Sequence, residues 1–191
     1  MPIYIIEHLE PKIWPWCLIE YGHISKIVGK NNLWFTNIKT VNKTAKELSK
    51  YGKIINKSVS ELHLINPCIL DPEAKRTLNP KEAKKFRYFI FGGILGDYPP
   101  KKRTKKELTQ FIRNPKTRNI GKQQMSTDNA VCTVKQIVSG KDLKDLKFKN
   151  KIEIRINKIE SIILPYKYNL IKEKPLISQD LVAFLKRKKG F

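Results

Sequence analysis

Along the first 140 residues, segments with the apolar pattern of a strand alternate with segments that have the apolar pattern of a helix. This order predicts that strands and helices alternate along the chain. Short runs of branched and aromatic residues predict strands, and apolar residues at helical spacing, bounded by capping residues or glycine, predict helices. The predicted strands are residues 2–7, 32–36, 53–55, 68–70, 87–91 and 117–120, and the predicted helices are residues 14–28, 44–51, 80–85, 104–112 and 127–138; residues 58–64 fit neither period. The order predicts an α/β fold, a mostly parallel sheet with helices on both faces.

The pattern changes after Gly140. Three isoleucines between residues 152 and 156 alternate with charged residues, which predicts a half-exposed strand at an edge or in a hairpin. Ser178 is placed to cap a final helix of residues 179–188. We therefore predict an α/β domain, residues 1–140, and a C-terminal extension, residues 141–191. The extension is expected either to face a substrate as a lid or to cover a sheet edge.

Two glycine-containing segments come directly after predicted strands. FGGILGDYPP occupies residues 91–100, and GKQQMSTD occupies residues 121–128. In open α/β sheets, ligands bind at the carboxyl ends of the strands, and glycine lets a small molecule approach the backbone. On spacing alone, the two segments predict the two sides of one ligand pocket.

The chain has 191 residues, a formal net charge of +22 and an ordinary hydrophobic content of 40%. Such a charge favours RNA, or an RNA-rich particle, as a neighbour. The alternative is a lysine-rich surface that reflects genome composition or growth temperature. The basic run at residues 101–106 lies beside the predicted pocket and is the better candidate for steering a polyanion; the run at residues 186–189 is typical of a solvated helix end.

Cysteine and histidine spacing predicts no metal site. The three cysteines form no CxxC pair and stand in apolar surroundings, as expected of reduced thiols in a cytoplasmic protein, and the three histidines have no metal-ligand spacing. No apolar run approaches the roughly 18 residues of a membrane-spanning helix. We therefore expect a cytoplasmic protein that has no membrane partner.

Several motifs together resemble one known family. FGGILGDYPP, Leu70-Asp71-Pro72 before it and RNIGKQQMSTD at residues 118–128 are similar to the SPOUT-class methyltransferases whose eukaryotic members methylate an arginine of a small-subunit ribosomal protein. The resemblance extends through YIIEHLEP at residues 4–11, WCLIEY at residues 16–21 and LPYKY at residues 164–168, so it covers nearly the whole chain. It implies a C-terminal trefoil knot in the α/β domain and S-adenosylmethionine (SAM) as the cofactor.

The resemblance also implies where SAM binds. Three loops would hold SAM. An apolar slot that includes Ile94 would receive the adenine ring, and glycines would stand where a Cβ would collide with SAM. Asp97 would accept hydrogen bonds from the ribose hydroxyls or from the ammonium group of SAM. Asp97 has an equally good alternative role in starting the turn that follows it. The predicted cofactor-binding residues are Leu70, Asp71, Pro72, Phe91, Gly92, Gly93, Leu95, Gly96, Asp97, Arg118, Gly121, Gln124, Met125 and Thr127.

An arginine acceptor makes a further demand on the site. Its pKa is roughly 12.5 to 13.8, so a carboxylate is needed to fix the guanidinium and take a proton. We predict Glu7 and Asp128 as these catalytic acids; their alternative roles are a surface residue after a strand and a helix cap. Glu20 is a further candidate, with a polar helix residue as its alternative role.

The functional prediction has three branches. The first is a SAM-dependent methyltransferase that acts on an arginine of a ribosomal protein, alone or within a ribosomal particle. The second keeps the cofactor but acts on rRNA or tRNA, with Lys101, Lys102 and Arg103 as substrate- or RNA-binding residues. The third is a non-catalytic, RNA-binding ribosome-assembly factor. The family often has an acidic residue where Lys101 and Lys102 stand, and arginine where Lys167 stands. The protein is expected to be a monomer or a homodimer.

Overall fold

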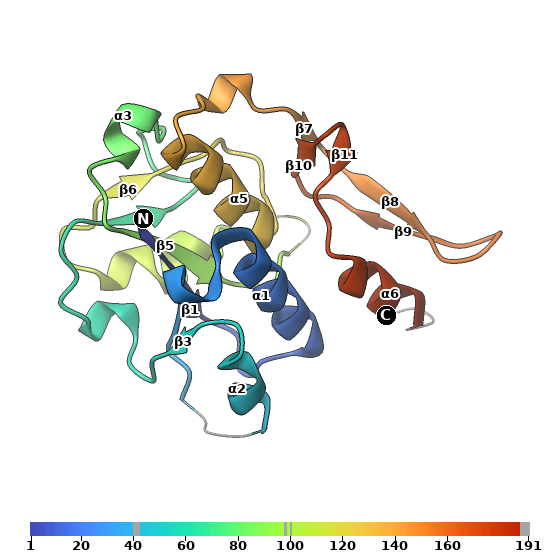
Figure 1. Ribbon diagram of the computed structural model, residues 1–191, viewed down its shortest axis with the longest axis horizontal. Coiled ribbons are helices and arrows are strands. Elements are labelled where there is room, and N and C mark those ends of the chain that lie inside the picture. Colours follow the sequence, from blue (N-terminus) through green and yellow to red (C-terminus); the bar gives the residue numbers. More distant parts are fainter. Residues whose placement is uncertain (40–42, 98, 100, 188–191) are drawn as a thin grey trace.

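The computed structural model describes residues 1–39, 43–97, 99 and 101–187. Its centre is a six-stranded sheet in the order β3-β2-β1-β5-β4-β6, in which every strand pairing is parallel (Figure 1). The strands are β1 (Ile3–His8), β2 (Leu33–Thr36), β3 (Lys53–Ile54), β4 (Pro67–Leu70), β5 (Tyr88–Gly93) and β6 (Thr117–Arg118). The predicted parallel α/β sheet is confirmed.

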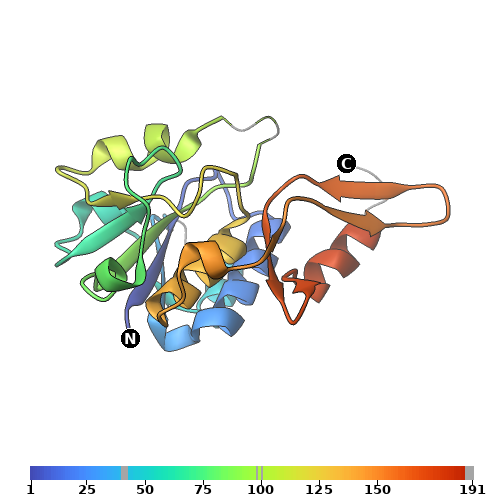
Figure 2. The ribbon, with the colours of Figure 1, turned by 90° about the horizontal axis from the view of Figure 1, so that it is seen from above.

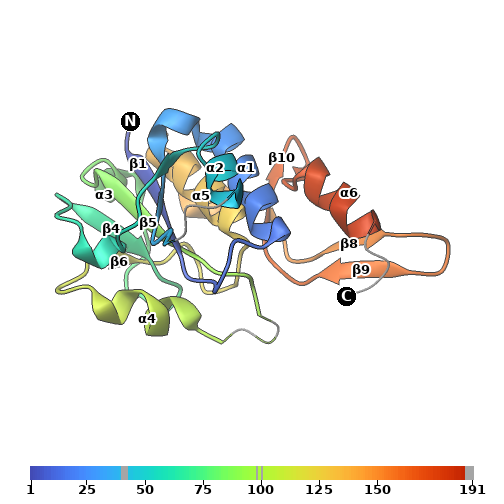
Figure 3. The same cartoon turned by 90° about the horizontal axis from the view of Figure 1, so that it is seen from below.

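Helices cover both faces of the sheet, as predicted (Figure 3). One face is covered by α1 (Pro15–Val28), α2 (Lys43–Leu48), α3 (Pro80–Ala83) and α5 (Thr127–Val138), and the other by α4 (Arg103–Glu107) with the 3-10 turns at Val59–Glu61 and Thr109–Phe111. Successive side chains of a strand point to opposite faces. Accordingly Tyr4 and Ile6 pack under α1 and α5, whereas Ile5 between them packs on the α4 face.

Two segments differ from the sequence prediction. The helix predicted for residues 104–112 ends at Glu107, because Leu108 leaves helical geometry and is buried in the core of the α4 face. The change of direction also lets the Thr109 hydroxyl donate to Asp71 at 2.7 Å. The ambiguous segment 58–64 forms a 3-10 turn capped by Ser58 and Glu61 in a reciprocal capping box.

The residues after 140 form a hairpin, a small sheet and a helix. The hairpin of β8 (Ile152–Arg155) and β9 (Ser161–Leu164) extends away from the α/β domain, with α6 (Gln179–Arg187) beside it (Figure 2). The small sheet consists of β7 (Phe148–Lys149), β10 (Tyr168–Ile171) and β11 (Lys174–Pro175). The predicted alternation is confirmed, because the isoleucines of β8 are buried and its charged residues are exposed.

A second hydrophobic cluster joins this extension to the α/β domain. Tyr168 and Leu181 of the extension are buried in it, and Trp16 and Ile19 of α1 pack against it. No described helix is long and apolar enough to cross a membrane. Two features named from the sequence, the last helical residue Lys188 and the residues flanking Pro99, lie outside the described residues. The trefoil knot and the domain boundary at residue 140 stay predictions.

His8, at the end of β1, is buried without full hydrogen bonding. Its Nδ1 lies 2.9 Å from the Tyr21 hydroxyl, while Nε2 is buried and has no partner in the described structure. Burial lowers the pKa of His8 below its ordinary value of about 6.5, and Glu10 opposes this only in part.

We therefore expect His8 to destabilise the fold in acid. Below about pH 6.5, His8 is protonated in the unfolded chain but stays neutral in the folded protein, because its folded pKa is lower. The free energy of unfolding therefore falls as the pH drops from about 6.5 towards the pKa of His8 in the folded protein. The measurement is the urea midpoint at pH 7.5 and pH 5.5 for the wild type and for His8→Gln. The variant should lose less stability on acidification; equal losses in the two proteins would contradict the assignment.

Candidate active site

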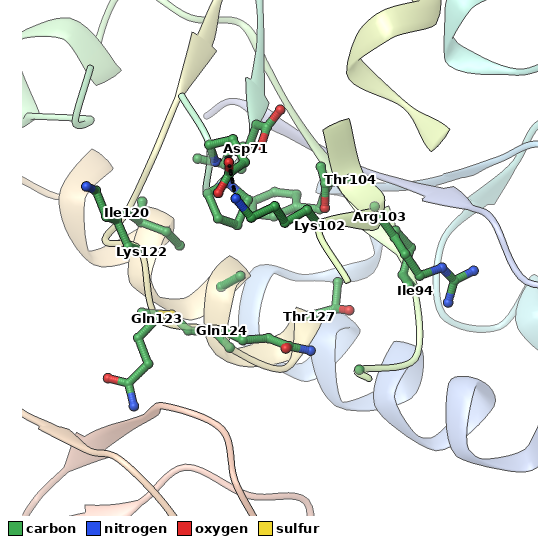
Figure 4. Close-up of a pocket in the computed structure, with 18 of the residues that line it drawn as sticks. Asp71, Ile94, Lys102, Arg103, Thr104, Ile120, Lys122, Gln123, Gln124 and Thr127 are labelled. Atoms are coloured by element: carbon green, nitrogen blue, oxygen red, sulfur yellow. Dashed lines mark hydrogen bonds and ion pairs between the residues drawn. The ribbon is translucent and has the colours of Figure 1, made fainter. Parts of the chain in front are cut away.

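Three loops meet at the carboxyl ends of neighbouring strands. Residues 94–97 follow β5, residues 71–73 follow β4, and residues 119–126 follow β6, and these three strands are adjacent in the sheet. Because parallel strands end at the same edge of a sheet, their loops converge there. The loops enclose a cavity of about 230 Å³, which we call the first cavity (Figure 4).

Most residues predicted to bind the cofactor line the first cavity. They share the three loops or the strand ends that lead into them: Leu70, Asp71, Pro72, Phe91, Gly92, Leu95, Gly96, Asp97, Gly121, Gln124, Met125 and Thr127. The two segments singled out from the sequence therefore do lie on opposite sides of one cavity.

Two of the predicted cofactor positions, Gly93 and Arg118, do not line the first cavity. A Cβ on Gly93 would lie 2.5 Å from the Tyr21 hydroxyl oxygen and 2.9 Å from a methyl of Ile6, so this glycine is required by packing under α1. The Arg118 guanidinium donates to both carboxylate oxygens of Glu82, at 2.9 and 3.0 Å, and so binds β6 to α3. Both positions have structural roles here, and their predicted part in cofactor binding stays a prediction.

The other glycines of the first cavity are also constrained by protein atoms. A Cβ on Gly96 would lie 2.6 Å from the Tyr166 ring and 2.7 Å from the Gln124 amide nitrogen, and one on Gly92 would lie 2.9 Å from Ile94. Gly121 has a φ of +98°, which favours glycine. Gly96 therefore lets Tyr166 of the extension pack directly on the loop after β5, where the Tyr166 hydroxyl donates to the Gly96 carbonyl at 2.9 Å.

Three of the basic residues at the first cavity are paired with carboxylates. Lys101 contacts Asp97 at 3.0 Å, and Lys102 reaches across the cavity mouth to Glu73 at 2.9 Å. Arg103 points away from the cavity (Figure 4) and donates to Glu107 and to Glu10, which raises the pKa of the Arg103 guanidinium. All three residues border the first cavity, but their charges are balanced by acids, and their role in substrate binding stays a prediction.

A second cavity of about 340 Å³ lies between the α/β domain and the extension. It shares residues 94–96 with the first cavity, so the loop after β5 forms a wall of both. The other residues that line it come from α1, the start of α5 and the extension: Trp16, Glu20, Ser126, Asp128, Ile162, Ile163, Leu164, Pro165, Tyr166, Tyr168, Ile177 and Leu181.

The three candidate acids occupy different places. Glu20 and Asp128 both line the second cavity, whereas Glu7 lines neither cavity. Glu7 is buried and accepts hydrogen bonds from the hydroxyls of Thr36 and Ser58 and from the Val59 amide, so it fixes the 3-10 turn to the end of β1. These contacts give Glu7 a structural role, and its predicted catalytic role stays a prediction.

Asp128 is fully engaged by neighbouring groups. Its Oδ2 lies 2.7 Å from His23 Nδ1, and its Oδ1 accepts from the Ser126 hydroxyl and the Asn129 amide. Glu20 differs, because its Oε1 accepts the amides of Thr127, at 2.7 Å, and Asp128, at 3.4 Å, while Oε2 has no hydrogen bond to any described residue. Burial, reinforced by the charge of Asp128, raises the pKa of Glu20 to about 8.

The sequence analysis missed much of this site. Glu73 and Thr104 also line the first cavity, yet they stand in no motif, and Lys122 lines it from within a motif without having been singled out. The second cavity was missed as a whole, although LPYKY supplies Tyr166 and Tyr168 to it. The described residues contain no cluster of His, Cys, Asp or Glu suited to a metal ion.

Solved structures of other proteins have a fold similar to that of this chain. The yeast arginine methyltransferase SFM1 complexed with SAM matches with a TM-score of 0.88 and 35% sequence identity, over 97% of this chain and 90% of that one. Trm10 from Thermococcus kodakaraensis matches in fold with a TM-score of 0.60 and 19% identity, over 76% of this chain and 96% of that one. The fold and the site define a methyltransferase of the SPOUT class.

Sequence comparison identifies the family to which the chain belongs within this class of methyltransferases. Residues 3–190 match the SFM1-like family, described as "Protein arginine N-methyltransferase SFM1-like". The protein arginine N-methyltransferase SFM1 of Saccharomyces cerevisiae is 36% identical over 200 residues, which cover 96% of this chain and 94% of that protein. The chain belongs to the SFM1-like family of protein arginine N-methyltransferases.

Proposed function

We propose that this protein transfers a methyl group from SAM to an arginine side chain of a ribosomal protein. The single observation that carries the proposal is the first cavity, built by the loops after β5, β4 and β6 in a chain of the SFM1-like family. Yeast SFM1, a relative at 35% identity, has been solved with SAM.

The residues of the first cavity suit SAM. Leu70, Leu95 and Met125 supply apolar surface for the adenine ring, and backbone groups of the three loops are available as hydrogen-bond partners. Asp97 supplies a carboxylate for the ribose hydroxyls or the ammonium group. When bound, SAM supplies a methyl group on a positively charged sulfur, so the protein needs chiefly to align the acceptor and exclude water.

The charge of the second cavity favours a protein acceptor over RNA. The described residues that line it include two acids, Glu20 and Asp128, and no lysine, arginine or histidine. A phosphodiester backbone is repelled by such a lining, whereas a cationic side chain is attracted. Lys101, Lys102 and Arg103 at the first cavity do not reverse this preference, because carboxylates already pair with them.

The ribosomal part of the proposal is supported by two observations. The sequence resembles a family whose eukaryotic members act on a ribosomal protein, and the net charge of +22 suits an RNA-rich particle. A cytoplasmic location belongs to the same proposal. Methylation of rRNA or tRNA is the second candidate, favoured by the same net charge.

Tritiated methyl transfer into a ribosomal fraction tests the acceptor. After incubation with labelled SAM, one half of the product is digested with nuclease and the other half with protease. We expect acid-precipitable label to survive nuclease and to disappear with protease, with methylarginine in the hydrolysate. Label lost to nuclease indicates RNA, and SAM binding without any transfer indicates the non-catalytic assembly factor.

A further inference from the structure

A groove of about 1000 Å³, which we call the edge groove, lies between α2, the edge strand β3 and residues 62–64. It shares no described residue with the first or the second cavity. We propose that the edge groove binds single-stranded RNA, with bases stacked on Trp34 and Tyr88 and phosphates held by lysines. The inference goes beyond the proposed function. Only the choice of RNA over DNA rests on that function, through its RNA-rich particle.

Two aromatic rings line the edge groove. Leu33 and Phe35 of β2 point into the core under α1, so Trp34 between them lies on the opposite face of the sheet, with Tyr88 of β5. The centres of the Trp34 and Tyr88 rings are 5.6 Å apart. Both side chains pack on the core of the α4 face, yet both stay partly exposed. Partly exposed aromatic rings are surfaces on which nucleic-acid bases stack.

Three exposed lysines line the groove together with these rings. Lys43 and Lys46 are three residues apart on α2, so they share one side of the helix, and Lys53 belongs to β3. Lys53 Nζ lies 4.6 Å from the centre of the Trp34 ring. The described lining of the groove contains no aspartate or glutamate. Such a lining attracts the phosphates of a nucleic acid, which carry one negative charge per nucleotide.

The charges of these three lysines are not balanced by acids. No described carboxylate forms an ion pair with any of them, whereas the basic run at residues 101–106 begins with two lysines that are each paired. The sequence from residue 39 to residue 57 has six lysines and one acid, Glu47, which does not line the groove. Phosphates can therefore bind these lysines without displacing a carboxylate.

The combination of rings and lysines selects the ligand. In a duplex the bases are stacked on one another, so their faces cannot reach rings inside a groove, whereas the unstacked bases of a single strand can. An acidic polypeptide would neutralise the lysines but would leave the two aromatic rings without a flat partner. A single strand uses both features, because each nucleotide carries a base and a phosphate.

The edge groove lies away from the cofactor loops. Tyr88 is the first residue of β5 and Gly93 is the last, and the loop that borders the first cavity follows Gly93. At about 3.3 Å per residue, the strand separates these two places by about 16 Å. RNA in the edge groove can therefore hold the enzyme on its particle while the first cavity stays open.

The test begins with a triple variant of the groove, Lys43→Gln, Lys46→Gln and Lys53→Gln. All three lysines are exposed, so the fold is retained.

The matched control removes the same charge at the other edge of the sheet. It changes three exposed lysines in and directly after α3, which an ion pair of Glu82 with Arg118 joins to β6 (Figure 1). The control variant is Lys81→Gln, Lys84→Gln and Lys85→Gln.

A third variant, Trp34→Leu, removes an aromatic ring but keeps an apolar side chain on the core of the α4 face. Fluorescence anisotropy measures the binding of a labelled oligouridine of about ten nucleotides at several salt concentrations. Calorimetry with SAM and a thermal melt show that each variant is folded, because the groove shares no described residue with the first cavity.

For the groove lysine variant we expect roughly 100-fold weaker RNA binding at about 0.1 M salt. The slope of log K against log salt should become less steep by about 2, because each lost phosphate contact of a single strand removes about 0.7. Trp34→Leu should bind roughly 10-fold more weakly with an unchanged slope, because stacking does not release counterions. The control variant should stay close to the wild type, and all variants should bind SAM normally.

An equal loss in the control variant would show that net charge alone binds RNA and would overturn the inference. Unchanged affinity in Trp34→Leu, or equally strong competition by an RNA duplex or by polyglutamate, would overturn it too. Tighter binding of oligothymidine of the same length would overturn the choice of RNA. None of these results touches the proposed function, which is judged by methyl transfer to an isolated ribosomal protein. The groove variants should carry out that transfer as the wild type does.

Discussion

Gly96→Val is expected to weaken SAM binding by roughly 100-fold, about 3 kcal/mol, while the protein stays folded. The first atom of the new side chain would lie 2.6 Å from the Tyr166 ring and 2.7 Å from the Gln124 amide nitrogen, so the loop after β5 has to shift. Gly96 is exposed and lies outside the main core, and the Tyr166 ring that it contacts lies at the edge of the second hydrophobic cluster. Calorimetry with SAM and a thermal melt of the same sample measure the two properties.

Ala183→Val is the matched control for this variant. Ala183 is exposed on α6, so the same kind of side chain is added away from both cavities. The control should bind SAM as the wild type does. Undiminished binding by Gly96→Val would show that the loop after β5 does not border the cofactor.

Gly93→Ala is expected to lower the free energy of unfolding by about 3 kcal/mol, whereas Gly96→Val is expected to lower SAM affinity. The added Cβ would lie 2.5 Å from the Tyr21 hydroxyl oxygen, 2.9 Å from Ile6 and 3.0 Å from the Glu7 carbonyl oxygen, in the middle of the core under α1. Urea denaturation measures the loss, and SAM affinity of the folded protein should stay close to that of the wild type, because Gly93 does not line the first cavity.

The double variant Gly93→Ala, Tyr21→Phe identifies the cause. Removing the Tyr21 hydroxyl removes the nearest of the three atoms, so the double variant should recover part of the loss relative to the two single changes. Full additivity of the two single changes would show that the close approach to Tyr21 is not what requires glycine here.

These two glycines show how far the sequence could predict the site. Both stand in the same motif and were assigned the same role, yet the pleat of β5 turns Gly93 under α1, while Gly96, beyond the strand, faces the cavities. A sequence motif indicates which stretch of the chain lies near a ligand. The face that each residue presents depends on packing partners far along the chain, here Tyr21 and Tyr166.

The fold was largely predictable for a simple physical reason. Alternation of strand and helix periods in the first 140 residues leaves few ways to bury the apolar faces, and a parallel sheet covered on both faces is the common one. The extension was harder, because its short strands bury apolar residues against Trp16 and Ile19 of α1, a contact that no local pattern encodes.

The candidate acids illustrate the same limit. The sequence favoured Glu7 and Asp128 over Glu20 as the catalytic acids, and the structure separates the three by their partners. Glu7 accepts three hydrogen bonds, Asp128 is hydrogen-bonded at both oxygens, and Glu20 is hydrogen-bonded to described residues at Oε1 alone. Only the spatial approach of α1 to the start of α5 brings Glu20 and Asp128 to one cavity.

The most direct test of the account is a crystal structure of this protein with S-adenosylhomocysteine, the product that SAM leaves behind. The account predicts electron density for the ligand in the first cavity, bordered by the loops of residues 71–73, 94–97 and 119–126, with its sulfur directed towards residues 94–96 and the second cavity. Ligand density anywhere else, or a first cavity filled by side chains in the crystal, would contradict it.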